Sequence, residues 1–264
     1  MAKLQDMFTQ ARRAQNGGGM GFLGKNKNEA KARAAALVVE LDQISAGSTE
    51  ALLKAGADGI LFLWDGKDTA QLEVLKQEIE AAKAHNANAV TGLHITGNLN
   101  KLSTESLKEL KEQGVQYVIL PFNAPARLLA QETKDLEKVI VVPMRKEENY
   151  PLYIRNLTAF DNIAAVLLDF DLGEKVGSMS IEEVLDYRAV REAVRFPAFI
   201  YVNGKINESD AYTINTLGIQ AVVLPATDSE EGTREQIKSL RTLLETVHQD
   251  ENDKDSPSLP SGRK

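Results

Sequence analysis

Gly114-Val-Gln-Tyr-Val-Ile-Leu-Pro121 and Gly218-Ile-Gln-Ala-Val-Val-Leu-Pro225 are two nearly identical stretches of this sequence, placed 104 positions apart. Each begins with a glycine that suits the end of a helix and continues with the apolar, β-branched residues of a buried strand. The segments before them also correspond, since Ile95-Thr-Gly-Asn-Leu-Asn100 resembles Val202-Asn-Gly-Lys-Ile-Asn207. Two matches in the same order indicate an internal repeat. We therefore expect the chain to contain two copies of one structural unit.

Eight apolar runs of strand length recur along the chain and alternate with segments of helical spacing. Nearly continuous runs of this kind are typical of parallel strands covered on both faces. They predict a single (β/α)8 TIM barrel made of two half-barrels, with an open doubly wound sheet as the alternative. The runs are Leu37–Leu41, Gly59–Trp64, Ala89–Ile95, Tyr117–Phe122, Lys138–Met144, Ala164–Phe170, Ala198–Val202 and Ala221–Pro225.

The two ends of the chain differ from the repeating part, so we expect three regions. Residues 1–34 form an N-terminal helix and a glycine-rich connector, residues 35–248 form the barrel, and residues 249–264 form a disordered acidic tail. Leu4, Met7, Phe8 and Ala11 lie on one face of the first helix. This face predicts a helix packed on the bottom of the barrel, or else an anchor on a membrane surface.

Local signals mark where several helices begin and end. Ser48, Ser103 and Ser180 each open a helical segment with acidic residues close behind, which predicts a hydroxyl N-cap at these three helices. Glycines at 56, 114 and 218 stand where a helix should turn into the next strand.

Composition narrows the class of protein. Hydrophobic residues make up 43% and charged residues 26% of the 264 residues, as in ordinary globular chains. The absence of cysteine excludes disulfides and cysteine nucleophiles, and the net charge of −7 argues against a nucleic-acid surface. The sequence contains neither an apolar run long enough to span a bilayer nor a continuous apolar signal at its start. We therefore expect a cytoplasmic protein that binds a small-molecule metabolite, and leave open whether it forms a homo-oligomer.

Polar side chains gather at the carboxyl ends of the predicted strands, which form the reactive face of a (β/α)8 barrel. Glu40, His94 and Asp169 lie near the ends of the first, third and sixth runs. A carboxyl group with a raised pKa, or an imidazole, can donate and accept a proton. We therefore predict catalytic roles for these three residues. The alternative is that the acids cap helices from solvated loops and that the histidine is structural.

Carboxylates from several strand ends would also suit a divalent cation such as Mg²⁺ or Mn²⁺. Alternation along a strand places Glu40 and Asp42 on one side of the first run, and Asp169 and Asp171 on one side of the sixth. We therefore predict Glu40, Asp42 and Asp171 as metal ligands. Arg145 follows the fifth run, where its planar guanidinium could hold a substrate carboxylate or phosphate.

Val202-Asn-Gly-Lys-Ile-Asn-Glu-Ser-Asp-Ala211, followed by Leu217-Gly-Ile-Gln-Ala-Val-Val-Leu224, resembles the last quarter of the phosphate-binding, aldolase-type TIM barrels. This superfamily includes thiamine-phosphate synthase, indole-glycerol-phosphate synthase and the twofold-repeated barrels of histidine biosynthesis. Its members bind phosphate through backbone amides after strands seven and eight. The resemblance implies substrate contacts at Gly204 and Thr227. If the chain is an enzyme, we also expect Asn203 to hold the substrate.

The sequence departs from this family in three ways. Asn203 stands where the family has a glycine, and the family's catalytic lysine has no equivalent here. Asp228, Glu230 and Glu231 bring negative charge close to the position of the phosphate, which is unfavourable by roughly 1 kcal/mol per pair at a protein surface.

Two functions follow from these observations. The first is a lyase or isomerase that acts on a small carboxylated or sugar-derived metabolite, with top-face residues as the active site. The alternative is a catalytically silent barrel that acts as a scaffold, a sensor or a partner-binding subunit.

Overall fold

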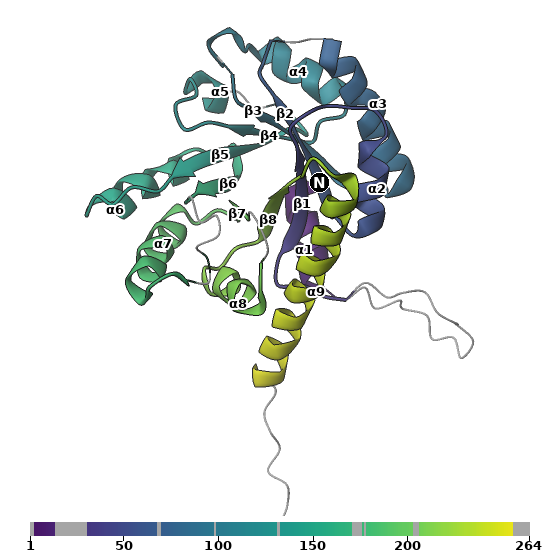
Figure 1. Cartoon of the computed structure of the whole chain (residues 1–264). Coiled ribbons are helices and arrows are strands. Elements are labelled where there is room, and N and C mark those ends of the chain that lie inside the picture. Colours follow the sequence, from purple (N-terminus) through teal and green to yellow (C-terminus); the bar gives the residue numbers. More distant parts are fainter. Residues whose placement is uncertain are drawn as a thin grey trace, which may run out of the picture.

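The computed structural model describes residues 3–13, 31–67, 70–97, 99–130, 133–170, 176, 178–202 and 206–255 (Figure 1). These residues form strands that alternate with helices along the chain. The elements are α1 (Lys3–Arg12), β1 (Ala36–Leu41), α2 (Ser48–Ala55), β2 (Gly59–Trp64), α3 (Ala70–His85), β3 (Val90–Ile95), η1 (Leu99–Lys101), α4 (Thr104–Glu112), β4 (Tyr117–Leu120), α5 (Arg127–Ala130), β5 (Glu137–Pro143), α6 (Tyr150–Ile154), η2 (Arg155–Ala159), β6 (Ile163–Asp169), α7 (Ile181–Val194), β7 (Ala198–Tyr201), α8 (Glu208–Thr216), β8 (Ala221–Pro225) and α9 (Glu230–Asp255).

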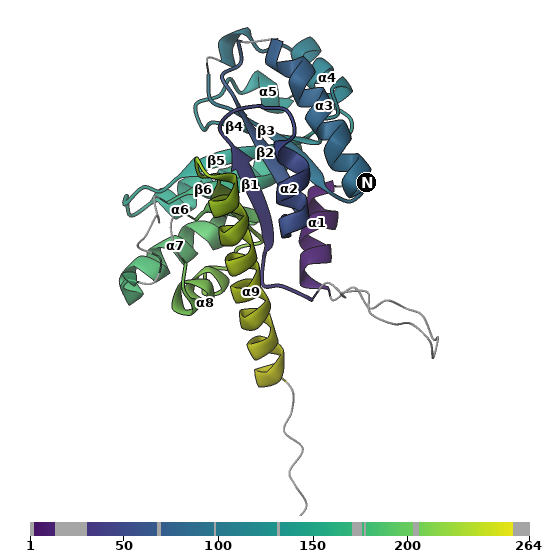
Figure 2. The ribbon, with the colours of Figure 1, turned by 45° about the vertical axis from the view of Figure 1, so that its right-hand side comes forward.

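The strands form a closed parallel barrel in sequence order, in which β1 pairs with both β2 and β8. This closure confirms the predicted (β/α)8 barrel and excludes the open sheet. Apolar side chains on the outer faces of the strands pack against the surrounding helices, and those on the inner faces fill the barrel. Figure 2 shows the helices around the barrel, with α2 and α9 beside β1.

The two halves of the barrel repeat each other at the positions that the sequence predicts. α4 and α8 both have nine residues, and each boundary of α8 lies 104 positions after the corresponding boundary of α4. Gly114 and Gly218 follow these helices with φ angles of 97° and 72°, and Gly56 ends α2 with a φ angle of 117°. These are left-handed conformations that glycine adopts at little cost. β4 and β8 then begin at Tyr117 and Ala221, again 104 positions apart.

The predicted hydroxyl caps are correct at two helices and wrong at the third. The hydroxyl groups of Ser103 and Ser180 accept hydrogen bonds from the first turns of α4 and α7. At α2 the N-cap is Gly47, and the cap comes from the buried carboxylate of Glu78 on α3. Glu78 accepts hydrogen bonds from the amides of Gly47 and Thr49, at 2.6 and 3.2 Å. A carboxylate from a distant helix therefore replaces the local serine.

α1 closes the N-terminal end of the barrel, where it contacts β1 and β3. Its four apolar residues are all buried, and the ring of Phe8 packs edge-on against Phe199 of β7 with the ring centroids 5.4 Å apart. The amide of Leu4 donates to Glu137 Oε2 of β5 at 2.8 Å. The apolar face of α1 is thus part of the core, as the barrel-bottom interpretation requires, and it is not exposed as a membrane anchor would be.

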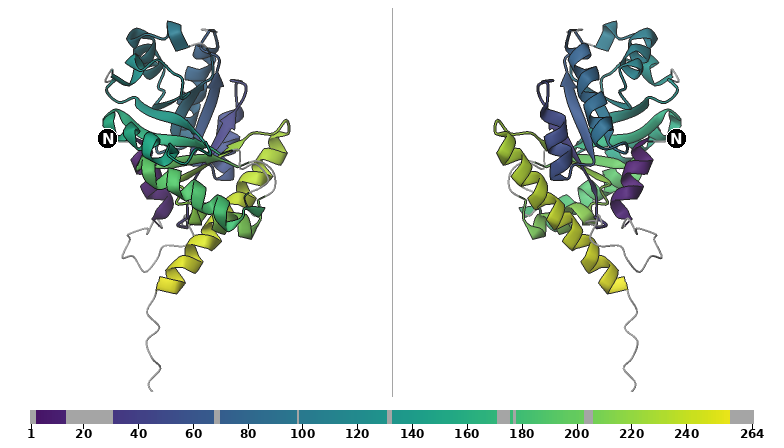
Figure 3. Two further views of the ribbon diagram at one scale, coloured as in Figure 1. Left: turned by 90° about the vertical axis from the view of Figure 1, so that its left-hand side faces the viewer. Right: turned by 90° about the vertical axis from the view of Figure 1, so that its right-hand side faces the viewer.

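The C-terminal helix is longer than the sequence suggests. α9 continues to Asp255, past residue 248 where polar composition predicts the barrel to end, and both views in Figure 3 show it extending beyond the other helices. Within the described part of the chain, every helix is too short or too polar to cross a membrane. The glycine-rich connector predicted before residue 34 lies largely outside the described residues.

At Gly92, in the interior of the barrel, only a residue without a side chain fits. Gly92 on β3 pairs in register with Tyr117 on β4, and the tyrosine ring lies across the glycine. A Cβ atom added at Gly92 would lie 2.1 Å from Cζ of Tyr117, well inside any van der Waals contact. The ring cannot move aside easily, because it stacks on Phe199 with the centroids 6.0 Å apart.

Gly92→Ala should lower the free energy of unfolding by about 1–3 kcal/mol, because it overpacks the barrel interior. Urea denaturation measures this change. Gly232→Ala on α9 is a matched control, since its Cβ would meet only side-chain atoms of Thr227 and Ser229, none closer than 3.3 Å. We expect it to be neutral or stabilising by up to about 1 kcal/mol. The double variant Gly92→Ala/Tyr117→Leu should recover part of the loss. Equal stability of the two single variants would contradict the packing described here.

Candidate functional site

A single layer of inward-facing side chains brings the candidate site together. In (β/α)8 barrels, alternate strands each contribute one residue to such a layer. The register of this barrel places Glu40 of β1, His94 of β3, Val141 of β5 and Tyr201 of β7 in one layer near the carboxyl ends of the strands. Three of its four members, Glu40, His94 and Tyr201, are polar and form a trio.

The trio is mutually hydrogen-bonded. The Tyr201 hydroxyl lies 2.5 Å from Glu40 Oε2, and His94 Nδ1 lies 3.0 Å from the Tyr201 hydroxyl and 3.2 Å from Glu40 Oε2. The side chains of Glu40 and His94 are only 12% and 15% exposed. Each group therefore exchanges most of its contact with water for contact with the other two, as buried polar groups must.

The chemistry of the trio assigns its protons. An ionised carboxylate only accepts hydrogen bonds, so Tyr201 O–H and His94 Nδ1–H are both donors. Burial, followed by the charge of Glu40 and the hydrogen bond to it, raises the pKa of Tyr201 far above its ordinary value, so the phenol keeps its proton. The neutral imidazole then has its lone pair on Nε2, which makes no hydrogen bond with the described residues. This nitrogen can accept a proton from a ligand.

Of the other acids predicted for the site, Asp169 lies close enough for its charge to act on Tyr201, and Asp42 lies beyond the end of its strand. Asp169 ends β6 on the inward side and is exposed at the mouth of the barrel. Its charge is among the smaller causes that raise the pKa of Tyr201, but it is not hydrogen-bonded to the trio. Asp42 is exposed beyond the end of β1.

The predicted metal ligands do not form a set in the described part of the chain. Glu40 is engaged by Tyr201 and His94, and Asp171 lies outside the described residues. Among the described residues, no three carboxylate or imidazole side chains are grouped to hold a cation. The described residues by themselves therefore do not form a Mg²⁺ or Mn²⁺ site, and the chemistry below uses protein groups only.

Of the predicted substrate-binding residues, the structure describes Arg145 and Thr227, and both already contact other groups of the protein. Arg145 is exposed after β5, with its guanidinium 5.9 Å from the ring centroid of Phe122 and 5.7 Å from that of Tyr150. Thr227 follows β8, but its amide donates to Thr233 Oγ1 at 2.9 Å and is not available to a phosphate. Asn203 and Gly204 lie outside the described residues.

Sequence reasoning placed Glu40 and His94 in the site but missed Tyr201. The signal that could have found it is the internal repeat. His94 on β3 and Tyr201 on β7 each come directly before one of the two corresponding segments, so they occupy equivalent positions in the two halves. An inward-facing histidine in one copy therefore predicts an inward-facing residue in the other.

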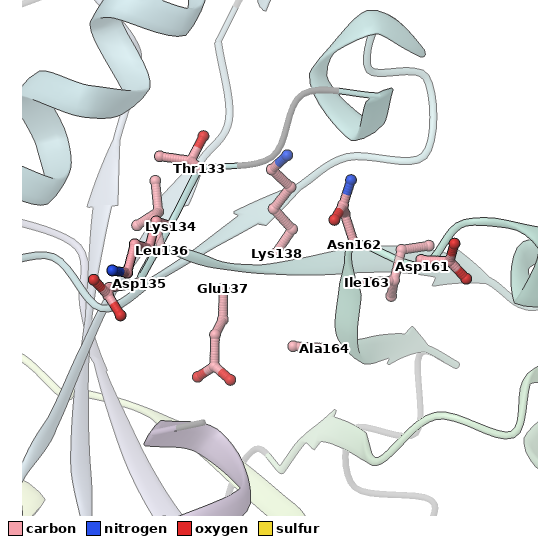
Figure 4. Close-up of a pocket in the computed structure, with 10 residues that line it drawn as sticks. All are labelled: Thr133, Lys134, Asp135, Leu136, Glu137, Lys138, Asp161, Asn162, Ile163 and Ala164. Carbon is pink, nitrogen blue, oxygen red and sulfur yellow. The ribbon is translucent and has the colours of Figure 1, made fainter. Parts of the chain in front are cut away.

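Two hollows of the described structure lie away from the trio. One of about 250 Å³ lies at the N-terminal ends of β5 and β6, at the opposite end of the barrel. Figure 4 shows that Glu137 and Lys138 point to opposite sides of β5 there, with Glu137 directed towards α1. Another, of about 490 Å³, lies between the outer face of β8 and α9 and is lined largely by uncharged residues, including Leu224 and Leu240.

Tyr201→Phe tests whether the phenol supports the buried carboxylate. The substitution should lower the free energy of unfolding by about 1.5–3 kcal/mol, the contribution of a hydrogen bond to a charged group. The matched control is Tyr212→Phe, which removes another phenol that donates to a carboxylate, that of Asp250 between α8 and α9. This second pair is more open to solvent, so we expect a smaller loss. Wild-type stability in Tyr201→Phe would contradict the network, and chemical denaturation measures both changes.

Comparison with known proteins places the chain among TIM barrels by structure alone. No family model matches the sequence, and no curated protein matches it. A thiamine phosphate pyrophosphorylase from Pyrococcus furiosus is similar with a TM-score of 0.56 and 15% identity, over 81% of this chain and 98% of that chain. Tryptophan synthase from Mycobacterium tuberculosis gives a TM-score of 0.61 and 16% identity, over 93% of this chain and 99% of that chain.

An aldolase from Escherichia coli K12 gives a TM-score of 0.54 and 13% identity, over 80% of this chain and 91% of that chain. Identities this low show a shared fold. The (β/α)8 architecture that the resemblance at strands seven and eight implies is therefore confirmed.

Proposed function

We propose that this protein is an enzyme of the lyase or isomerase type that moves a proton on a small carboxylated or sugar-derived metabolite. The trio at the mouth of the barrel carries this proposal. A partly buried carboxylate, imidazole and phenol at hydrogen-bond distance form an acid–base set. Enzymes with this fold carry their active sites on this face.

In the proposed reaction, His94 is the group that exchanges a proton with the substrate. Its Nδ1–H is held by Glu40 and Tyr201, so Nε2 is free to take a proton from a substrate carbon or hydroxyl. The imidazolium that forms is stabilised by the carboxylate of Glu40, as a buried acid stabilises the histidine of a catalytic triad. Tyr201 stays neutral and fixes the carboxylate through its hydrogen bond.

Two residues at the mouth complete the proposed site. Asp169 is exposed on the mouth side of the trio, where it is placed to contact a hydroxyl or amine of the substrate. Arg145 extends from the loop after β5 and supplies the positive charge that a carboxylate needs. The neighbouring solved structures support this proposal at the level of the barrel, since their names describe a pyrophosphorylase, a synthase and an aldolase.

The experiment starts with ligands, because the substrate is not identified. A thermal-shift screen against carboxylated and sugar-derived metabolites, each with and without phosphate, identifies binders; a ligand at one hundred times its Kd adds about 2.7 kcal/mol of stability. Each binder is then incubated with the protein in D₂O, and proton NMR records the exchange of carbon-bound hydrogen for deuterium. This readout detects proton abstraction without knowledge of the product.

His94→Gln should slow this exchange by about 10²–10⁴-fold, the usual contribution of a general base. His85→Gln is the matched control, since His85 is exposed at the end of α3, and it should leave the rate unchanged. The proposal is contradicted if the panel contains no binder, or if exchange proceeds equally fast in His94→Gln.

One observation favours a second function, that of a partner-binding subunit. Five large hydrophobic side chains are exposed in the described structure, and all belong to residues 152–185. Ile181 and Leu185 are 82% and 62% exposed on α7, and Leu152 is 62% exposed on the neighbouring α6. Concentrated exposure of this kind is typical of interaction surfaces. We propose that this surface, formed by Leu152, Tyr153, Phe160, Ile181 and Leu185, mediates association into a homo-oligomer.

Sedimentation velocity tests this second function. The wild-type chain should sediment as a species larger than a monomer, and Ile181→Glu/Leu185→Glu should sediment as a monomer. The substituted residues are on the solvent side of α7, so the fold should be retained. A wild-type chain that stays monomeric at all accessible concentrations would contradict the homo-oligomer.

A further inference from the structure

A row of paired residues leads from Tyr117 to the candidate site. Tyr117 pairs in register with Gly92, Gly92 with Leu61, and Leu61 with Glu40, across β4, β3, β2 and β1. All four residues face the barrel interior, as the alternation along each strand requires. Because Gly92 has no side chain, the ring of Tyr117 lies across it, and its hydroxyl end is directed along the row towards β1.

The Tyr117 hydroxyl is a buried polar group without a partner. The residue is 0% exposed, and its oxygen has no hydrogen bond with any described residue. The charge that acts on this hydroxyl is that of Glu40, whose Oε2 already accepts from Tyr201 and lies near His94. Glu137, which pairs with Tyr117 from β5, instead accepts a hydrogen bond from the amide of Leu4 on α1. A buried hydroxyl without a hydrogen bond is unfavourable, and proteins commonly satisfy such a group with an internal water molecule.

We infer that Tyr117 is a positioning residue of the candidate site, and that it donates a hydrogen bond to Glu40 through one buried water molecule at the floor of the site. The water accepts from the phenol and donates to the carboxylate. The Glu40 carboxylate is thus fixed by two phenols, by Tyr117 through the water and by Tyr201 through a direct hydrogen bond. This inference deepens the proposed function, on which it rests for the catalytic meaning of Glu40.

The protonation of Tyr117 agrees with this role. Burial, followed by the negative charge of Glu40, raises the pKa of Tyr117 far above its ordinary value. The phenol therefore stays neutral at every physiological pH and remains a donor. Tyr117 also contributes to the raised pKa of Tyr201, as expected if the two phenols approach the same carboxylate.

The change in Tm of Tyr117→Phe shows whether the hydroxyl of Tyr117 is hydrogen-bonded to a water or has no partner. Loss of a water-mediated bond should lower Tm by about 2–4 °C, whereas removal of an unpartnered hydroxyl should leave it unchanged or raise it. Tyr150→Phe is the calibration, because Tyr150 is equally buried and its hydroxyl donates to the Pro143 carbonyl at 2.6 Å. We expect the two variants to shift Tm in the same direction. An unchanged or higher Tm in Tyr117→Phe would overturn the inference.

Two further measurements report on the site itself. A high-resolution crystal structure of the wild-type chain should show a water within hydrogen-bond distance of the Tyr117 hydroxyl and the Glu40 carboxylate, and Tyr117→Phe should lack it. The carboxyl ¹³C resonance of Glu40 should shift in Tyr117→Phe, while that of Glu78, a buried acid outside the barrel, should not. Absence of this water from the wild-type structure would also overturn the inference, as would an unchanged Glu40 resonance in Tyr117→Phe.

These measurements need no substrate. If the water is present but the chain exchanges no substrate hydrogen for deuterium, only the proposed function fails. If substrate hydrogen is exchanged for deuterium but the buried water is absent, only the role of Tyr117 fails.

Discussion

The stagger between neighbouring strands decides which side chains can meet inside this barrel. Each strand is displaced relative to its neighbour, so inward-facing residues of alternate strands reach the same height and form a layer. Glu40, His94 and Tyr201 are up to 161 positions apart in the chain, yet this stagger makes them hydrogen-bond partners. The same stagger places Gly92 where the ring of Tyr117 must pass. A register shift of one residue in β1, β3 or β7 would turn the trio residue of that strand outwards and separate the trio.

The two half-barrels share their architecture but differ in the chemistry that they contribute. α4 and β4 correspond to α8 and β8 at a constant offset, including the glycines that end both helices. The layer that holds the trio, however, is asymmetric. Glu40 of β1 stands opposite Val141 of β5, and His94 of β3 stands opposite Tyr201 of β7. One copy therefore supplies the carboxylate and the imidazole, and the other supplies the phenol, so neither copy alone can form the network.

Much of the fold could be predicted from the sequence, because it depends on local patterns. Continuous apolar runs locate the strands, and the repeated glycine-to-strand motif identifies the barrel and its halves. The N-cap of α2 could not be predicted, since Glu78 reaches it from another helix. In the site, Glu40 and His94 could be predicted because they lie near the ends of apolar runs. Their contact with Tyr201 could not, because it depends on the register between strands that are distant in the sequence. Asp42 illustrates the same limit, because alternation alone does not show that β1 ends before it.

The protonation of His94 tests the central claim most directly. The chain has only three histidines, so long-range ¹H–¹⁵N NMR resolves their rings, and His94→Gln assigns the resonances. The hydrogen bonds of the trio predict that the neutral ring of His94 carries its proton on Nδ1, with an unprotonated Nε2, and that Tyr201→Phe and Glu40→Gln disturb this preference. A proton fixed on Nε2, or a tautomer that neither substitution changes, would show that Glu40 and Tyr201 do not hold the imidazole.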